Sequence, residues 1–439
     1  MSIIYPPDLL PQIKSAWKAP TGFHSRPRPS LPDDDALKEL LDLAYQTSLL
    51  REEGRKLTFR IVYLPRDKGK KRGATSLSRQ NSRLAEFSND RQFTIAELRR
   101  LAPAADAIRS MICVDYVKGE WRVWAILDTG ANWWNFSRHE SNIGKPPPEN
   151  FAIYSQGPGE LTISSGGFTL LSLRSGSVYM PMGSALHRGP VSSHFQPARE
   201  LLYKEAIEEL EQRVWDEDGN DDDYPSRFYD MCLSRILSGI RELGHGGTLI
   251  VVPDHLSPND SRLTDRITIK HQCNYDFAWN LMVQSLELHS KYYALHFPLW
   301  ESQRPIATDD YQSISILESR RLENSESLSD CLRFIASLSS VDGALILTTK
   351  MRLIGFGGEI TAQSPTLQNV QLAANPDAST LKRVSIESYG TRHRSAFRLV
   401  SSYEDAIAFV ISSDGGVKAT KRIGSNVVLW PEIQANQFS

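Results

Sequence analysis

The spacing of apolar and polar positions divides the 439-residue chain into two halves that both mix helices with strands. In the first half, apolar residues recur at helical spacing from residue 34 onward. Period-two runs rich in β-branched and aromatic residues predict strands at residues 57–64, 111–116, 121–127, 151–154, 160–164 and 168–173. Glycine-containing breaks separate the later runs. The first half is therefore expected to be a β-rich α+β domain with tight turns.

The second half begins with a helix, a glycine turn and a strand. The helical pattern at residues 226–242 leads into three glycines within residues 244–247 and then into an apolar strand at 248–252. Later helices are predicted at 275–293 and 327–338, strands at 341–347, 351–356, 406–412 and 416–420, and a polar loop at 362–380. The pattern predicts an α/β domain whose mixed β-sheet is flanked by helices.

Proline and acidic residues suggest where the domains end. Prolines at positions 6, 7, 11, 20, 27, 29 and 32 predict an irregular lead-in over residues 1–33. A helix at residues 197–214 is followed by an acidic run at 216–223, which repels itself and seldom packs. We therefore expect an N-terminal domain at 34–215, an acidic linker at 216–224 and a second domain at 225–435.

The overall charge restricts the partners. The 50 basic and 52 acidic side chains give a net charge of −2, which disfavours a protein that coats nucleic acid. The basic run at residues 66–72 is either a solvated loop or an anion-contacting loop. No apolar stretch is long enough to cross a membrane, and the N-terminus does not resemble a secretory signal. Four well-separated cysteines without CxxC spacing fit reduced thiols, so we expect a cytoplasmic protein.

Four tryptophans, at positions 121, 124, 133 and 134, gather in the first half. They could pack in the core or line an aromatic ligand pocket.

A cationic cluster near the C-terminus indicates an anion site. Gly390 lets the backbone bend and Thr391 offers a hydroxyl. Arg392, His393 and Arg394 then place three donors ahead of a helical stretch. Because arginine binds phosphate through two nitrogens and a helix N-terminus favours negative charge, a triphosphate is the expected ligand.

A carboxylate stands at the mouth of a predicted strand. Asp342 is followed by the small residues Gly343 and Ala344, which leave its carboxylate unobstructed. Such a group can hold a divalent cation or polarise a hydroxyl. Together with the cationic cluster, it points to phosphate chemistry.

The sequences DGA at 342–344 and GTRHR at 390–394, in this order, resemble the motif pair of the diadenylate cyclase domain. The resemblance covers about residues 225–430, and FIASLSSVDGALILT at 334–348 is more similar to the DNA-integrity-scanning branch of that family. It implies a diadenylate cyclase-like fold and the condensation of two ATP molecules into cyclic di-AMP and two pyrophosphates. It also implies a homodimer or higher oligomer in which two ATP sites face each other.

The resemblance assigns a role to each matching residue. Asp342 would bind Mg²⁺ or Mn²⁺ and help to deprotonate the ribose 3′-hydroxyl, and Gly343 would let the nucleotide approach the backbone. Asp414 is a second possible metal ligand. The nucleotide and phosphate contacts would come from Gly343, Ala344, Gly390, Thr391, Arg392, His393, Arg394 and Ser412.

Two departures from the family pattern leave a second hypothesis open. Many members carry paired glutamates in the turn where this chain has Ser412, Ser413 and Asp414, of which only Asp414 could substitute, and residues 273–326 form an insertion. The first hypothesis is an active cyclase regulated by an N-terminal sensor domain. The second is a catalytically inactive module that binds ATP or a cyclic dinucleotide. The ligand of the N-terminal domain is not readable from the sequence.

Overall fold

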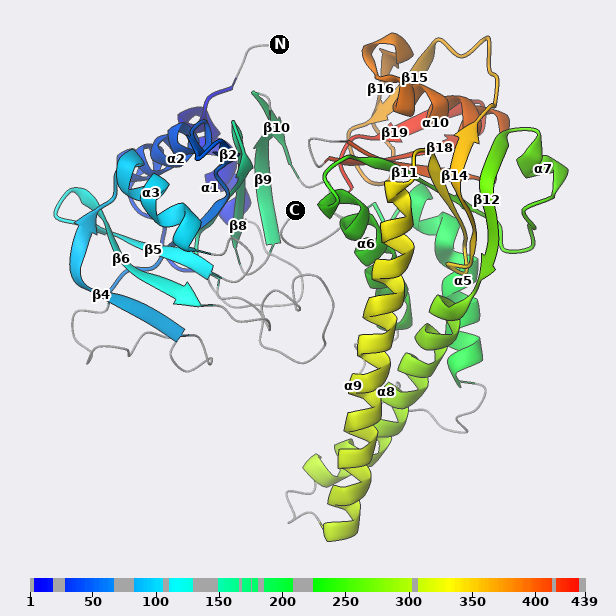
Figure 1. Ribbon diagram of the computed structural model, residues 1–439, viewed down its shortest axis with the longest axis horizontal. Coiled ribbons are helices and arrows are strands. Elements are labelled where there is room, and N and C mark those ends of the chain that lie inside the picture. Colours follow the sequence, from blue (N-terminus) through cyan, green and yellow to red (C-terminus); the bar gives the residue numbers. More distant parts are fainter. Residues whose placement is uncertain are drawn as a thin grey trace. The chain divides into compact units, whose positions relative to one another are not determined.

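The computed structural model describes residues 4–18, 28–66, 83–105, 110–128, 149–165, 168–174, 176–180, 185–207, 224–301, 307–412 and 416–433. The chain divides into two compact units, Met1–Pro181 and Met182–Ala435, if the last few residues are left aside. Each unit combines a mixed β-sheet with helices, which confirms the predicted α+β and α/β classes (Figure 1). Within the described ranges, no helix has the length and apolarity needed to span a bilayer.

The first unit is built on an eight-stranded sheet in the order β10-β9-β8-β7-β3-β5-β6-β4, with β3 and β5 parallel. Its helices are η1 (Pro6–Leu9), α1 (Leu10–Lys18), α2 (Asp34–Ser48), α3 (Ile95–Leu101) and η3 (Ala102–Ala104). Its sheet strands are β3 (Phe59–Tyr63), β4 (Arg83–Gln92), β5 (Ser110–Val117), β6 (Glu120–Asp128), β7 (Ala152–Gly157), β8 (Glu160–Ser165), β9 (Phe168–Arg174) and β10 (Ser177–Tyr179). A separate hairpin pairs β1 (Arg51–Glu52) with β2 (Arg55–Lys56).

Two tryptophans anchor the opposite faces of this sheet. The Trp121 indole N–H donates to the Ala36 carbonyl of α2 at 2.9 Å, within the core beneath the helices. The Trp124 indole N–H donates to the Leu64 carbonyl at 3.1 Å, within the core of the other face. Both are buried, so the core-packing interpretation is confirmed for them. Positions 133 and 134 lie outside the described residues.

The prediction of an irregular lead-in is wrong for residues 6–18. The prolines at positions 6, 7 and 11 stand in the first turns of η1 and α1, where a missing N–H costs no helical hydrogen bond. Leu9, Leu10 and Ile13 are buried in the same core as α2. This helix therefore covers part of the sheet instead of trailing from it.

The second unit is built on a nine-stranded sheet in the order β12-β14-β13-β11-β17-β18-β19-β15-β16. Its helices are α5 (Pro190–Ile207), α6 (Tyr224–Glu242), α7 (Ser261–Thr264), α8 (Phe277–Glu301), α9 (Thr308–Ser337), η4 (Leu338–Ser340), η5 (Ile386–Ser388) and α10 (Thr391–Ser402). Its strands are β11 (Gly247–Val252), β12 (Ile267–Tyr275), β13 (Ala344–Thr348), β14 (Leu353–Ile360), β15 (Asn369–Ala373), β16 (Leu381–Ser385), β17 (Ile407–Ile411), β18 (Val417–Ile423) and β19 (Asn426–Trp430).

The three central strands of this sheet are buried along their whole length. Strand β11 is parallel to β13 on one side and antiparallel to β17 on the other. One face of the sheet shares a core with α5, α6, α8 and α9, and the other shares a core with α10. This uninterrupted burial agrees with the apolar run that predicted β11. A ligand can therefore reach these strands only at their ends.

The division between the units falls earlier than the acidic run predicted. Helix α5, which the sequence placed in the N-terminal domain, packs in the second unit. The Phe195 ring stacks on Phe409 of β17 with centroids 6.3 Å apart, and Arg199 forms a buried ion pair with Asp230 of α6. The acidic run itself lies outside the described residues.

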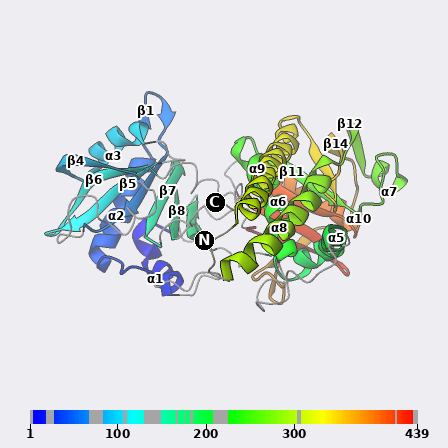
Figure 2. The same cartoon turned by 90° about the horizontal axis from the view of Figure 1, so that it is seen from below.

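The insertion at residues 273–326 forms most of a helical hairpin. Helices α8 and α9 run side by side, as both views show (Figures 1 and 2). The Asn324 side-chain amide ties them by donating to the Leu281 carbonyl at 3.1 Å. The predicted polar loop at 362–380 is interrupted by β15, which pairs in parallel with β19.

Candidate functional site

Two of the predicted site segments, residues 342–344 and Ser412, lie at one end of β11, β13 and β17. Thr248 of β11 pairs with Ala344, the first residue of β13, and Gly247 pairs with Ile411, the last residue of β17. Asp342 and Gly343, which precede β13, therefore lie at the same end of the strands as Ser412, which follows β17. With neighbouring strands about 4.8 Å apart, β13 and β17 are separated here by roughly 10 Å.

Helix α10 packs against β17 and β18. Near its other end, the Ser401 carbonyl accepts a hydrogen bond from the Arg422 guanidinium at 3.1 Å. Arg422 follows Lys421, which pairs with Ile407 at the start of β17, the end remote from Ser412. Because a 12-residue helix is about 18 Å long, the first turn of α10 lies well away from its C-terminal end at the start of β17.

The first turn of α10 is open to a ligand. Gly390 is the N-cap residue, no side chain caps the helix, and a Cβ at Gly390 would meet nothing within 4 Å. Thr391 and Arg392 are exposed, and Arg392 forms no ion pair with any described residue. Helix N–H groups that no cap occupies form an anion-binding surface, to which Arg392 adds a positive charge.

The other two members of the GTRHR motif are partly engaged. The Arg394 guanidinium donates to Glu387 at 3.0 Å. The His393 ring is half-buried and lies 5.6 Å from the Tyr389 ring and 6.3 Å from the Phe397 ring, centroid to centroid. Arg394 must therefore share its charge with Glu387, and His393 is held by aromatic packing.

Gly343 has a structural reason to be glycine. Its φ is +125°, and a Cβ at this position would lie 2.5 Å from the Gly357 carbonyl carbon of β14. Both the backbone conformation and the approach of β14 require the missing side chain. The resemblance assigned this glycine to the nucleotide, but the contact with β14 accounts for it without a ligand.

Asp342 is an exposed carboxylate with no ion pair among the residues that the structure describes. Over the same residues, no group of three or more His, Cys, Asp or Glu side chains could hold a metal ion. Mg²⁺ is often held by one or two carboxylates, with water and substrate phosphates completing its shell. Asp342 fits such a site. Asp414, the other expected ligand, lies outside the described residues.

The sequence analysis missed one cation at this edge. The Lys418 ammonium donates to the Ser412 hydroxyl at 3.4 Å. Lys418 pairs with Val410, whose side chain packs in the α10 core, so both point to the α10 face. The alternation of Val417, Lys418 and Ala419 could have indicated a distinct face for Lys418, but the sequence alone could not tell that α10 covers it.

Comparisons with known proteins concern the N-terminal unit. A protein-family model described as "Probable sensor domain DACNV" matches residues 26–128, which run from before α2 to the end of β6. This match supports the expected N-terminal sensor domain and covers less than a quarter of the chain. No curated protein matches the sequence.

Proposed function

We propose that this protein is a diadenylate cyclase whose N-terminal unit acts as its sensor domain. One observation carries the proposal. Asp342 and Ser412 are far apart in sequence, yet the strand register brings them to the same end of β13 and β17, and the same unit offers the open N-terminus of α10. A carboxylate together with an anion-binding helix end would suit the activation of a hydroxyl beside a phosphate.

The match to a sensor domain supports the same function from the other half of the chain. Domains of this kind usually accompany diadenylate cyclase domains. A regulated enzyme needs both parts, and the two units are separately compact.

In the proposed reaction, each residue acts on a defined atom. The N–H groups at the start of α10 and Arg392 bind the phosphates of ATP, and Lys418 with Ser412 neutralises charge on the neighbouring oxygens. Asp342 orients the ribose 3′-hydroxyl and would hold Mg²⁺ or Mn²⁺, which would supply a lower pKa for the attacking hydroxyl. Each 3′-oxygen bonds to the α-phosphorus of the opposite ATP, releasing a proton and a pyrophosphate.

The reaction requires two copies of the chain. One copy offers one α10 N-terminus and one Asp342, so it positions one ATP. Both bonds form only when a second copy presents its own nucleotide in a facing site. The specific activity of the full chain should therefore fall on dilution, and constant turnover by a monomer identified by light scattering would contradict facing sites.

The test is an assay for cyclic di-AMP by mass spectrometry, with ATP and Mn²⁺ or Mg²⁺. The Asp342→Asn variant should lose at least about 100-fold in product while it still binds ATP. Asp309→Asn is the matched control, because this exposed aspartate begins α9 at the far end of a 30-residue helix. Equal product from wild type and Asp342→Asn would reject the cyclase.

An inactive nucleotide-binding module is the second candidate function. It is favoured by the absence of a multi-carboxylate cluster over the described residues and by Ser412 and Ser413 where many diadenylate cyclases carry paired glutamates. It predicts ATP binding in calorimetry without any cyclic di-AMP, even at high protein concentration.

A further inference from the structure

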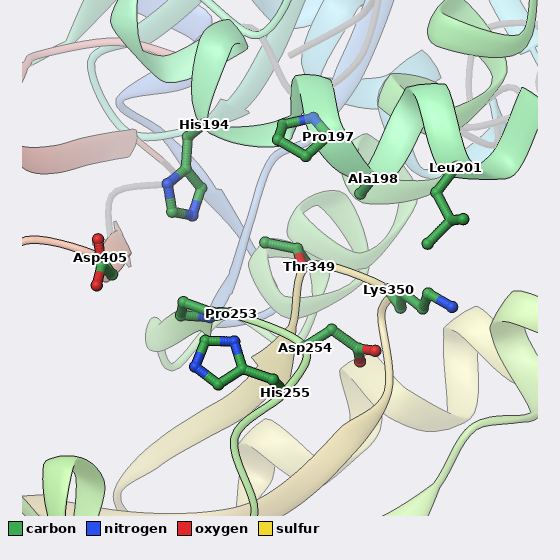
Figure 3. Close-up of a pocket in the computed structure, with 10 residues that line it drawn as sticks. All are labelled: His194, Pro197, Ala198, Leu201, Pro253, Asp254, His255, Thr349, Lys350 and Asp405. Carbon is green, nitrogen blue, oxygen red and sulfur yellow. The ribbon is translucent and has the colours of Figure 1, made fainter.

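A pocket of about 510 Å³ lies at the opposite end of the same three strands. Its floor is formed by the segments that follow two strands, Pro253, Asp254 and His255 after β11 and Thr349 and Lys350 after β13. Asp405, which precedes β17, also lines it (Figure 3). Helix α5 covers it with His194, Pro197, Ala198 and Leu201. None of these residues belongs to the site described above. The pocket falls within the size range of small-molecule sites.

The walls of the pocket are apolar on two opposing sides. Pro197 and Leu201 of α5 face the loop that carries Pro253 (Figure 3). Rigid rings and an aliphatic side chain on opposite sides favour a flat, apolar body between them.

The cation in the pocket is already neutralised. The Lys350 ammonium lies 3.0 Å from a Glu205 carboxylate oxygen and 5.0 Å from the centre of the Trp279 ring. It therefore offers little attraction to a phosphate. A polyanion would also meet the exposed carboxylate of Asp405, which repels it.

Two carboxylates leave acceptor capacity in the pocket. The Oδ1 atom of Asp254 accepts from the Thr348 hydroxyl at 2.8 Å and from Arg352 at 3.4 Å, whereas no described hydrogen bond reaches its Oδ2. The Asp405 carboxylate accepts no hydrogen bond from any described residue. These oxygens can receive N–H groups of a ligand.

His194 supplies the opposite capacity, a hydrogen-bond donor. Its Nδ1 lies 3.2 Å from the Lys421 ammonium, which can only donate, so Nδ1 accepts and the proton resides on Nε2. Burial, with the charge of Lys421, lowers the pKa of His194 to about 3, so the ring is neutral at physiological pH. Nε2 is buried and has no partner among the described residues, which costs about 1–3 kcal/mol until an acceptor arrives.

We propose that this pocket binds a small, uncharged, flat heterocycle that carries an exocyclic amino group. The amino group donates to Asp405, a ring nitrogen accepts from His194 Nε2, and the ring lies between Pro197 and Pro253. A small shift of the His194 side chain that keeps Nδ1 at Lys421, of the kind that commonly accompanies binding, would open the buried Nε2 to the ligand. The proposal goes beyond the cyclase and does not depend on it.

The test uses 2-aminopyrimidine as the probe and pyrimidine as its matched control, followed by saturation-transfer NMR on the full chain. 2-Aminopyrimidine should give a saturable signal, and pyrimidine should bind at least about threefold more weakly because it lacks the donor. Equal binding of the two probes, or no saturable binding of 2-aminopyrimidine to folded protein, would overturn the proposal.

Variants of residues inside and outside the pocket test whether 2-aminopyrimidine binds there. Asp405→Ala removes an exposed acceptor and should weaken 2-aminopyrimidine at least about threefold. Leu201→Trp should block the pocket, whereas Tyr203→Trp, at an exposed position of the same helix, should not. Asp342→Asn should leave the binding unchanged. Loss of binding in Asp342→Asn, or full binding in Leu201→Trp with an unchanged melting temperature, would assign the probe to another site.

Discussion

The two ends of β11, β13 and β17 carry opposite chemistry on the same strands. The end that begins β13 carries Lys418 beside Ser412, and the same unit offers the open N-terminus of α10 with Arg392, all of which attract anions. The end that follows β13 gathers Asp254 and Asp405 with a neutral His194, which do not. Because the strands between them are apolar and buried, the flanking loops and helices decide which ligand each end can hold.

The largest expected effect is on the stability of the backbone around Gly343, at the anion-binding end. Gly343→Ala places a Cβ against the backbone of β14 at a positive φ, and we expect a loss of about 3 kcal/mol in unfolding free energy. Gly390→Ala, where the Cβ meets nothing, should cost less than about 1 kcal/mol. Urea unfolding of both variants measures the difference, and equal stabilities would mean that β14 does not approach Gly343 so closely.

The second effect concerns the pocket end and its pH dependence. The pKa of His194 is about 3 in the folded chain, below its ordinary value of 6.5, so the unfolded chain binds the extra proton between these values. This contribution to stability is complete above pH 6.5 and is lost as the pH falls. Wild type should therefore lose about 2 kcal/mol more than His194→Gln between pH 6.5 and pH 5. Identical pH profiles in urea unfolding would contradict a neutral, buried His194.

The third effect separates the two ends by their affinity for phosphate. Arg392→Ala should weaken ATP binding about tenfold, because an arginine–phosphate hydrogen bond is charge-assisted. Its stability should not change, since Arg392 is exposed. Arg383→Ala, at an exposed position of β16, is the control. Isothermal titration calorimetry with ATP and Mg²⁺ gives the comparison, and equal weakening by both variants would indicate only a general electrostatic effect.

The smallest effect compares two lysines of one strand. Lys418 contacts Ser412 at the anion-binding end, whereas Lys421 contacts His194 near the pocket. Lys418→Gln should weaken ATP binding about fivefold, and Lys421→Gln should leave it unchanged. If Lys421→Gln has the larger effect in the same titration, the phosphates lie at the pocket end.

Much of the fold follows from local patterns in the sequence. Asp33 caps α2 and Thr94 caps α3 by accepting from the Ala36 N–H and the Glu97 N–H, and both residue types favour the N-cap position. The predicted strands of the first half all form, because alternation reports directly on a half-buried sheet. Local patterns failed where long-range packing decides. Helix α5 joined the second unit through Phe195 and Arg199, which no local signal reveals.

The two motifs of the candidate site could be predicted from the sequence, but the residues from other strands that join them could not. Asp342 and the residues from Gly390 to Arg394 stand out by type and order alone. Lys418 does not, because its value depends on the register between β17 and β18 and on the face that α10 covers. The pocket likewise combines four separate segments, and only the packing of α5 brings them together.

The most direct test of the central claim is a crystal structure of the full chain with α,β-methylene-ATP and Mg²⁺, since the methylene group prevents the cyclisation. We predict triphosphate density against the first turn of α10, in contact with Arg392 and Lys418, and a ribose beside Asp342. Triphosphate density between α5 and Asp254, with no ligand near Gly390, would contradict the assignment of phosphate chemistry to the Asp342 end.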